Sequence, residues 1–236
     1  MGQDIKERIL VPEIMDDFEM EGSLLENALR KIVRINRLLG GNRITIRGVS
    51  ALMRQAPDRE VVITDIGCGN GDMLRVLADY GRRKGWKLRL VGIDANRFTV
   101  QLATALSAGY PEISYHCMDV TSEAFDDMHT DIALFTLTLH HFTDDMIIRL
   151  MQRTQRLVRI GVVVNDLQRN MLAYRLFQLI CFLFRVNRMT KADGLASILR
   201  GFKRKELLLL AQQLNIQHYS LRWQWAFRYQ WIISNL

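Results

Sequence analysis

The stretch at residues 61–72, VVITDIGCGNGD, constrains the fold more than any other part of the chain. Its apolar first half is typical of a β-strand that ends at Asp65. Gly67, Gly69 and Gly71 then follow at alternate positions, and a helical pattern begins directly after them. Because glycine has no Cβ, the backbone can turn tightly here and come close to a ligand. The next helix would point free N–H groups at that ligand. The stretch therefore predicts a strand–turn–helix unit with a ligand site at the turn.

The strand–helix unit repeats along the chain. Helical patterns separate apolar strands that are predicted at residues 61–65, 88–93, 113–117, 131–137 and 160–166. Such a repeat specifies an α/β fold: a mostly parallel sheet with right-handed crossovers and helices on both faces, whose ligands bind outside the carboxyl ends of the strands. Candidate functional residues gather at or just beyond these ends: Gly67, Gly69, Gly71, Asp94, Asp119, His140, His141 and Asp166.

The residues before the first strand are expected to form a helical extension. Ser23 and Glu26 have the spacing of a capping box at the start of a first helix, and a second helix is expected near residues 44–53. The helix after the glycine turn is expected to run through Tyr80, and residues 81–85 to form a basic loop.

The residues after the fifth strand depart from the repeat. Residues 169–201 contain a segment that is apolar on almost every side, which indicates a helical insertion covering an apolar ligand pocket; a dimer interface and simple core packing are the alternatives. A helix and an antiparallel strand pair are expected to close the chain. We expect a single domain over residues 1–236, made of a helical extension at 1–56, a cofactor-binding core at 57–168, a helical lid at 169–201, and a closing helix and strand pair at 202–236.

The composition is that of a globular protein without covalent cross-links. Hydrophobic residues make up 49% of the chain, enough to bury a sizeable core. Cys68, Cys117 and Cys181 lie far apart with no CxxC spacing, so neither a disulfide framework nor a structural zinc site is expected. The N-terminal stretch lacks the apolar core of a signal peptide. The apolar run at 176–184 is interrupted by Gln178 and is too short to span a bilayer. We expect a soluble, cytoplasmic protein.

The chain is basic, with a net charge of +7 and a pI of about 9.6. A basic balance raises the question of a nucleic-acid partner. The arginines are spread along the chain, however, and no block of five or six like charges occurs. A solvated basic surface, or one that prefers anionic or lipid surfaces, is therefore favoured over nucleic-acid binding, and a peripheral membrane contact stays open.

The pattern Asp65-x-Gly67-x-Gly69-x-Gly71 resembles motif I of the class I S-adenosylmethionine-dependent methyltransferases. The nicotinamide fingerprint would require a glycine where Asp72 stands. The resemblance implies a seven-stranded sheet with strand order 3-2-1-4-5-7-6 and S-adenosylmethionine as the cofactor.

The same resemblance assigns cofactor contacts to later strand ends. Asp94 would accept hydrogen bonds from the ribose hydroxyls. Asp119 would accept a hydrogen bond from the adenine amino group, and its neighbour Met118 would contribute a backbone N–H. The alternatives are capping of the next helix by Asp94 and an ordinary turn at Asp119. The full set of implied cofactor-binding residues is Asp65, Gly67, Cys68, Gly69, Gly71, Asp94, Ala95, Met118, Asp119, Val120 and Thr136.

Two adjacent histidines follow the fourth strand, in a segment, Leu139-His140-His141, that small-molecule methyltransferases of this class often carry. If the acceptor is a hydroxyl group, histidine has a suitable intrinsic pKa to take its proton. We favour His141 over His140 as this base, with Asp166 orienting either the acceptor or the histidine. A turn-shaping role for the histidines and helix capping by Asp166 are the alternatives.

No metal site is expected. Metal-dependent catechol methyltransferases need an aspartate at the end of strand 4 and an Asp-Asn pair after strand 5. Here the fourth strand ends in Thr136-Leu137-Thr138, and the fifth offers Asn165-Asp166 in the reverse order.

These features predict a methyltransferase that acts on a small hydrophobic acceptor, at an oxygen atom. Residues 12–17 and 35–41 look like segments of bacterial methyltransferases found with polyketide-type pathways, which favours an aromatic, polyketide-like or lipidic acceptor. The alternatives are an RNA or protein methyltransferase, suggested by the basic pI, and a non-catalytic nucleoside-binding module of the same fold. The sequence leaves open the acceptor, the methylated atom and whether the protein is a homodimer.

Overall fold

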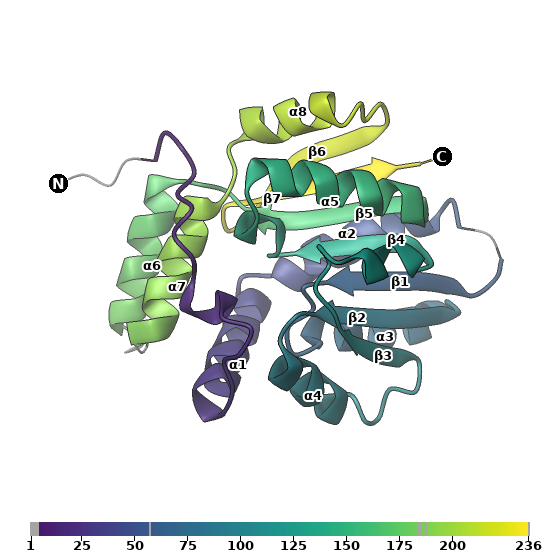
Figure 1. The fold of residues 1–236 in the computed structure, drawn as a ribbon, viewed down its shortest axis with the longest axis horizontal. Coiled ribbons are helices and arrows are strands. Elements are labelled where there is room, and N and C mark those ends of the chain that lie inside the picture. The colour runs from purple at the N-terminus through teal and green to yellow at the C-terminus, as the bar shows by residue number, and fades with distance from the viewer. Residues whose placement is uncertain (1–4, 57, 184–185, 187, 236) are drawn as a thin grey trace.

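The fold is built on a seven-stranded sheet with strand order β3-β2-β1-β4-β5-β7-β6 (Figure 1). The structure, a computed structural model, describes residues 5–56, 58–183, 186 and 188–235. Strands β1 to β5 pair in parallel, and β7 runs antiparallel to both β5 and β6. The mostly parallel sheet and its predicted order are thus confirmed. The strands are β1 (Val61–Ile66), β2 (Leu88–Asp94), β3 (Ile113–Cys117), β4 (Thr130–Thr136), β5 (Val158–Leu167), β6 (Tyr219–Gln224) and β7 (Arg228–Ser234).

Helices cover both faces of the sheet. On one face, α2 (Gly41–Met53) and α3 (Asp72–Lys84) bury Leu52, Leu74 and Leu77 against inward-facing side chains of β1, β2 and β4. On the other face, α5 (Asp144–Leu157) and α8 (Arg204–Gln213) bury Ile147 and Leu207. The central strand β4 is buried along almost its whole length, as expected of a parallel strand covered on both sides. The elements that directly follow β2, β3 and β4 are α4 (Arg97–Leu106), η2 (Glu123–Asp127) and η3 (Leu139–His141).

Two local predictions are wrong. Ser23 does not cap the first helix, α1 (Ser23–Leu38), because Gly22 at a φ of +85° takes the cap position without a side-chain hydrogen bond. Glu26 instead pairs with Arg30 one turn later. The expected basic loop is also helical through Lys84. Its three basic residues lie in the last turn of α3, where they complement the helix dipole, and Gly85 ends the helix in a left-handed conformation.

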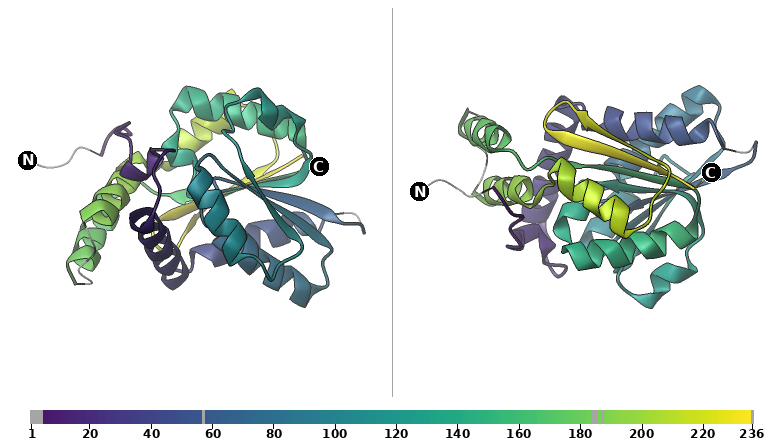
Figure 2. Two further views of the ribbon diagram at one scale, coloured as in Figure 1. Left: turned by 60° about the horizontal axis from the view of Figure 1, so that its bottom comes forward. Right: turned by 90° about the horizontal axis from the view of Figure 1, so that it is seen from above.

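Segments that are far apart in the sequence meet at the carboxyl edge of the parallel strands (Figures 1 and 2). The N-terminal segment with η1 (Ile14–Asp16) lies there beside α1, α6 (Met171–Leu183) and α7 (Arg188–Arg200). Arg169, at the end of β5, holds this segment by donating a hydrogen bond to the carbonyl of Ile5, at 3.0 Å. The helical insertion expected after the fifth strand is therefore present as α6 and α7. No helix in the described part of the chain is long and apolar enough to cross a bilayer.

Candidate active site

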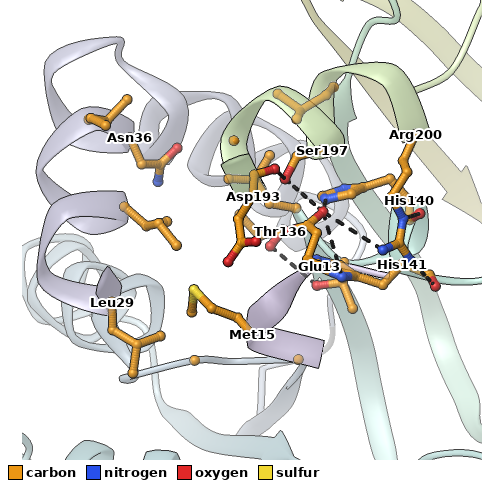
Figure 3. Close-up of a pocket in the computed structure, with 18 of the residues that line it drawn as sticks. Glu13, Met15, Leu29, Asn36, Thr136, His140, His141, Asp193, Ser197 and Arg200 are labelled. Atoms are coloured by element: carbon orange, nitrogen blue, oxygen red, sulfur yellow. Dashed lines mark hydrogen bonds and ion pairs between the residues drawn. The ribbon is translucent and has the colours of Figure 1, made fainter. Parts of the chain in front are cut away.

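A cavity of about 970 Å³ opens at the carboxyl edge of the sheet. The ends of β1, β2, β4 and β5 form its floor, while η1, α1, α6 and α7 form its walls (Figure 3). Leu176, Leu179 and Leu183 on α6 line the cavity and are each more than 40% exposed, so the cavity reaches the surface along this helix. One site is therefore built by several strand ends, as the repeat predicts.

The glycine turn after β1 forms an open cradle on the cavity floor. Gly67, Gly69 and Gly71 all have positive φ angles, of +71°, +53° and +75°, which side chains rarely allow. A Cβ added to Gly69 would approach only Leu29, at 3.8 Å, so the space above this residue is free for a ligand. Gly71 does not line the cavity; it sets the start of α3 and leaves room for the Tyr115 hydroxyl.

Two carboxylates flank this cradle. Asp65 is buried, and burial followed by the nearby charge of Asp94 raises its pKa to about 8. Its Oδ1 has no hydrogen-bond partner among the described residues. Asp94, at the tip of β2, accepts the N–H groups of Gly69 and Asn96, both at 3.0 Å. Burial raises the pKa of Asp94, and these two hydrogen bonds limit the increase. The turn thus offers acceptors to a ligand with hydroxyl or cationic groups.

Apart from Cys68 in the glycine turn, the remaining predicted cofactor residues lie on both sides of β1, beyond the ends of β2 and β3 on one side and at the end of β4 on the other. Asp119 also stabilises its own turn, because its Oδ1 accepts the backbone N–H and the hydroxyl of Thr121, each at 2.8 Å. The hydroxyl of Thr136, at the end of β4, lies 3.2 Å from that of Thr45. The other members of this group that line the cavity are Cys68, Ala95, Met118 and Val120.

His140 is buried between two carboxylates. Its Nδ1 lies 2.6 Å from Oδ1 of Asp166, and its Nε2 lies 3.6 Å from Oε1 of Glu13. Burial alone would lower the pKa of His140, but Asp166 and Glu13 outweigh it and raise the pKa to about 9. Burial would likewise raise the pKa of Asp166, whereas the contact with His140 lowers it. His140 is therefore an imidazolium at neutral pH, and it joins the N-terminal segment to β5.

His141 has a different carboxylate partner. Its Nδ1 lies 2.6 Å from Oδ1 of Asp16, and its side chain is 29% exposed at the cavity. Asp16 also accepts a hydrogen bond from Nη1 of Arg200, at 2.7 Å. Burial would raise the pKa of Asp16, but His141 and Arg200 hold it far below its usual range. Figure 3 shows His141, Arg200 and Glu13 converging at one wall of the cavity.

The structure thus separates the three predicted catalytic residues. Asp166 orients His140 and does not line the cavity, whereas His141 is oriented by Asp16. Sequence reasoning missed Glu13 and Asp16 as site residues. Their only signal was the resemblance of residues 12–17 to segments of other methyltransferases.

The same wall has the ligand types of a metal site. One atom each from Glu13, His140 and His141 lies within 4.8 Å of the other two. Arg200 already places a guanidinium 4.0 Å from Oε1 of Glu13 and 2.7 Å from Asp16. A permanent positive charge therefore occupies part of the space where a cation would be favoured, and the expected absence of a metal stays a prediction.

The central part of the chain is similar to a known protein family. Residues 63–161, which run from β1 into β5, match the family described as a methyltransferase domain. The search of the curated proteins found no match.

The chain also resembles solved structures in fold. One is the plantazolicin methyltransferase BpumL, in complex with a triazolic desmethylPZN analog and SAH, with a TM-score of 0.66, 15% identity, and coverage of 88% of this chain and 90% of that one. Another is the CurJ carbon methyltransferase, with a TM-score of 0.57, 12% identity, and coverage of 77% and 50%. A third is an O-methyltransferase family 2 protein from Planctomyces limnophilus in complex with apigenin, with a TM-score of 0.54, 11% identity, and coverage of 75% and 51%. At these identities the likeness concerns the fold.

Proposed function

We propose that this chain is a class I S-adenosylmethionine-dependent methyltransferase that methylates a small hydrophobic acceptor at an oxygen atom, and its partial match to a methyltransferase domain and its fold support this. The observation that carries the proposal is that one cavity joins the glycine cradle to an apolar chamber under α6 and α7. The pairing of His141 with Asp16 at the wall of this cavity supports methylation of a hydroxyl group.

The residues around the cradle fit the cofactor. The open space above Gly69 suits its methionine part, and the unpartnered oxygen of Asp65 suits a cationic group. Asp94 holds the turn and keeps lone pairs for ribose hydroxyls. When bound, S-adenosylmethionine supplies an electrophilic methyl group that is already activated for displacement. The protein then has to align the acceptor and keep water out.

The far part of the cavity suits a hydrophobic acceptor. Phe177 and Ile180 on α6 line it, together with Ile198 on α7. Apolar walls of this kind bury most of a small ligand and leave orientation to a few polar groups. The exposed leucines on α6 lie at the entrance, so we assign this helix and α7 as the lid of the acceptor site. A large polar macromolecule such as RNA would bring charged groups against these apolar walls, and that alternative is disfavoured.

His141 is the better base of the two histidines. Nδ1 of His141 faces Asp16, so in the neutral imidazole with its N–H at Nδ1 the lone pair is on Nε2, where it can take a proton from an acceptor hydroxyl. His140 already carries a proton at neutral pH, with a pKa of about 9. His140 and Asp166 are therefore assigned to positioning, since they hold Glu13 and the N-terminal segment against the site.

Incubation with metabolite extracts tests this proposal. Purified protein, S-adenosylmethionine with an isotope-labelled methyl group, and a fractionated extract should give a product that is heavier by one CH₂ unit plus the mass of the label in mass spectrometry. The product should partition into organic solvent. Its fragmentation in mass spectrometry should be that of a methyl ether or methyl ester rather than of a methylated amine. Labelling confined to RNA or protein fractions would refute the small-acceptor proposal. A His141→Ala sample provides the matched control.

A further inference from the structure

Arg228 is a buried guanidinium at the rim of the acceptor chamber. It is the first residue of β7, directly after a turn in which Ala226 and Phe227 have φ angles of +62° and +55°. The carbonyl of Phe227 accepts a 2.8 Å hydrogen bond from the N–H of Gln168, so this turn is fixed to the end of β5. Arg228 lines the cavity, yet only 3% of the residue is exposed.

This guanidinium has no carboxylate partner within the described residues. Its one hydrogen bond goes from Nη1 to Oδ1 of Asn165 at 3.5 Å, and its Nε has none. The nearest acidic influence is Asp166, whose charge is already paired with His140. Burial accordingly lowers the pKa of Arg228 to about 10.

Two other buried arginines behave differently. Arg200 pairs with Asp16 at 2.7 Å, and Arg169 pairs with Glu206 at 2.5 Å. A buried charge without a partner is costly, so such a group is retained where it has a use. Arg228 differs from both in having no carboxylate partner among the described residues, so it is a candidate to bind an anionic ligand.

A second positive feature points to the same corner. The residue at the N-cap position of the 13-residue helix α2 is Gly40, which has no side chain to cap the helix. A Cβ added to the next residue, Gly41, would lie 3.0 Å from Nη1 of Arg228 and 1.9 Å from Oδ1 of Asn36. Glycine thus lets Arg228 and Asn36 approach the helix terminus closely. Free N–H groups at a helix N-terminus attract anions, and a guanidinium binds carboxylates in a forked geometry.

We propose that Arg228, together with the N-terminus of α2, binds an anionic oxygen group of the acceptor, such as a carboxylate. The position of β7 in the sheet favours the acceptor over the cofactor. Two strands, β4 and β5, separate β7 from the glycine turn of β1, so their backbones lie roughly three strand spacings, or about 14 Å, apart. This inference rests on the proposed function, because it assumes that the apolar chamber holds the acceptor. It narrows the acceptor class to hydrophobic acids.

The test uses the full chain saturated with S-adenosylhomocysteine and two probe pairs, octanoate with octan-1-ol and 4-phenylbutanoate with 4-phenylbutan-1-ol. Calorimetry should show that the wild type binds each acid on the order of 10-fold or more tightly than its alcohol, as expected for a charge-assisted contact. Arg228→Met should remove that preference, and Arg228→Lys should keep part of it. Arg222→Met, at an exposed arginine on the neighbouring strand, should leave it unchanged.

Two further measurements separate the rival roles of Arg228. Arg228→Met should not lower the Tm of the ligand-free protein, because it removes an unpaired buried charge; a clear fall would show a structural role and overturn the proposal. Affinity for S-adenosylhomocysteine should stay within about threefold of wild type. A loss of tenfold or more would place the methionine carboxylate of the cofactor at Arg228 and also overturn it. Equal binding of acids and alcohols by the wild type would refute an anion site. Failure of the wild type to bind S-adenosylhomocysteine would instead count against the proposed function.

Discussion

Asp65→Asn should make the ligand-free protein more stable while weakening its cofactor site. The pKa of Asp65 rises from its ordinary value of 3.8 to about 8 in the folded chain. At neutral pH the folded protein therefore holds a proton at this position that the unfolded chain releases. Asparagine has a similar shape and no charge, so the variant avoids the free energy of keeping this carboxyl group protonated.

The magnitude depends on pH in a defined direction. A carboxyl group whose pKa is raised by folding makes the folded protein less stable as the pH rises from the unfolded pKa to the folded pKa, here from 3.8 to about 8. Each pH unit inside this window is worth about 1.4 kcal/mol. From pH 5 to pH 7, the advantage of the variant over wild type should grow by up to about 3 kcal/mol. For a chain of this length that is roughly 5–10 °C in Tm.

Thermal melts of both proteins at pH 5, 6 and 7, without ligand, measure this difference. Comparing variant with wild type at each pH cancels the titration of all other groups. Asp58→Asn is the matched control, because the Asp58 side chain is fully exposed and should show no such trend. A variant whose Tm difference from wild type stays constant over this range, or that is less stable at pH 7, would refute the reasoning. S-adenosylmethionine should also raise the Tm of the variant less than that of wild type.

The remaining predictions concern the other site residues. Millimolar S-adenosylmethionine should raise the Tm of wild type, and Asp94→Ala should reduce this rise in scanning fluorimetry; no shift in wild type would contradict the cofactor site. His141→Ala should cut turnover on the order of 10²-fold or more, and Asp16→Asn should cut it less. Near-normal rates for His141→Ala would show that His141 is not the base. Turnover should survive EDTA, since Arg200 already lies against the carboxylates of Glu13 and Asp16. Activity lost with EDTA and restored by a divalent cation would instead assign a metal to this wall.

The features that the sequence predicted correctly are those set by the local conformation of the backbone. The three glycines after β1 have the positive φ angles that their spacing indicates. The apolar strands occur near the expected residues, because a strand buried on both faces needs a short run of apolar side chains. Where local signals compete, the prediction failed. Gly22 displaced Ser23 as the cap of α1, and the residues expected to form a basic loop continued α3 because their charges suit its last turn.

The sequence by itself determined the sheet, the glycine cradle and the carboxylates at its strand ends, since these follow from the chain conformation of a few neighbouring residues. Only the tertiary structure decided the partners within the site. His141 meets Asp16 across 125 positions of sequence, and Asp166 takes His140 rather than its neighbour. Arg228 is one of 32 lysine and arginine residues in the chain, and no pattern along the sequence marks it as unpaired. Side-chain pairing depends on which distant segments pack together, and on the free energy that it costs to bury each charge without a partner.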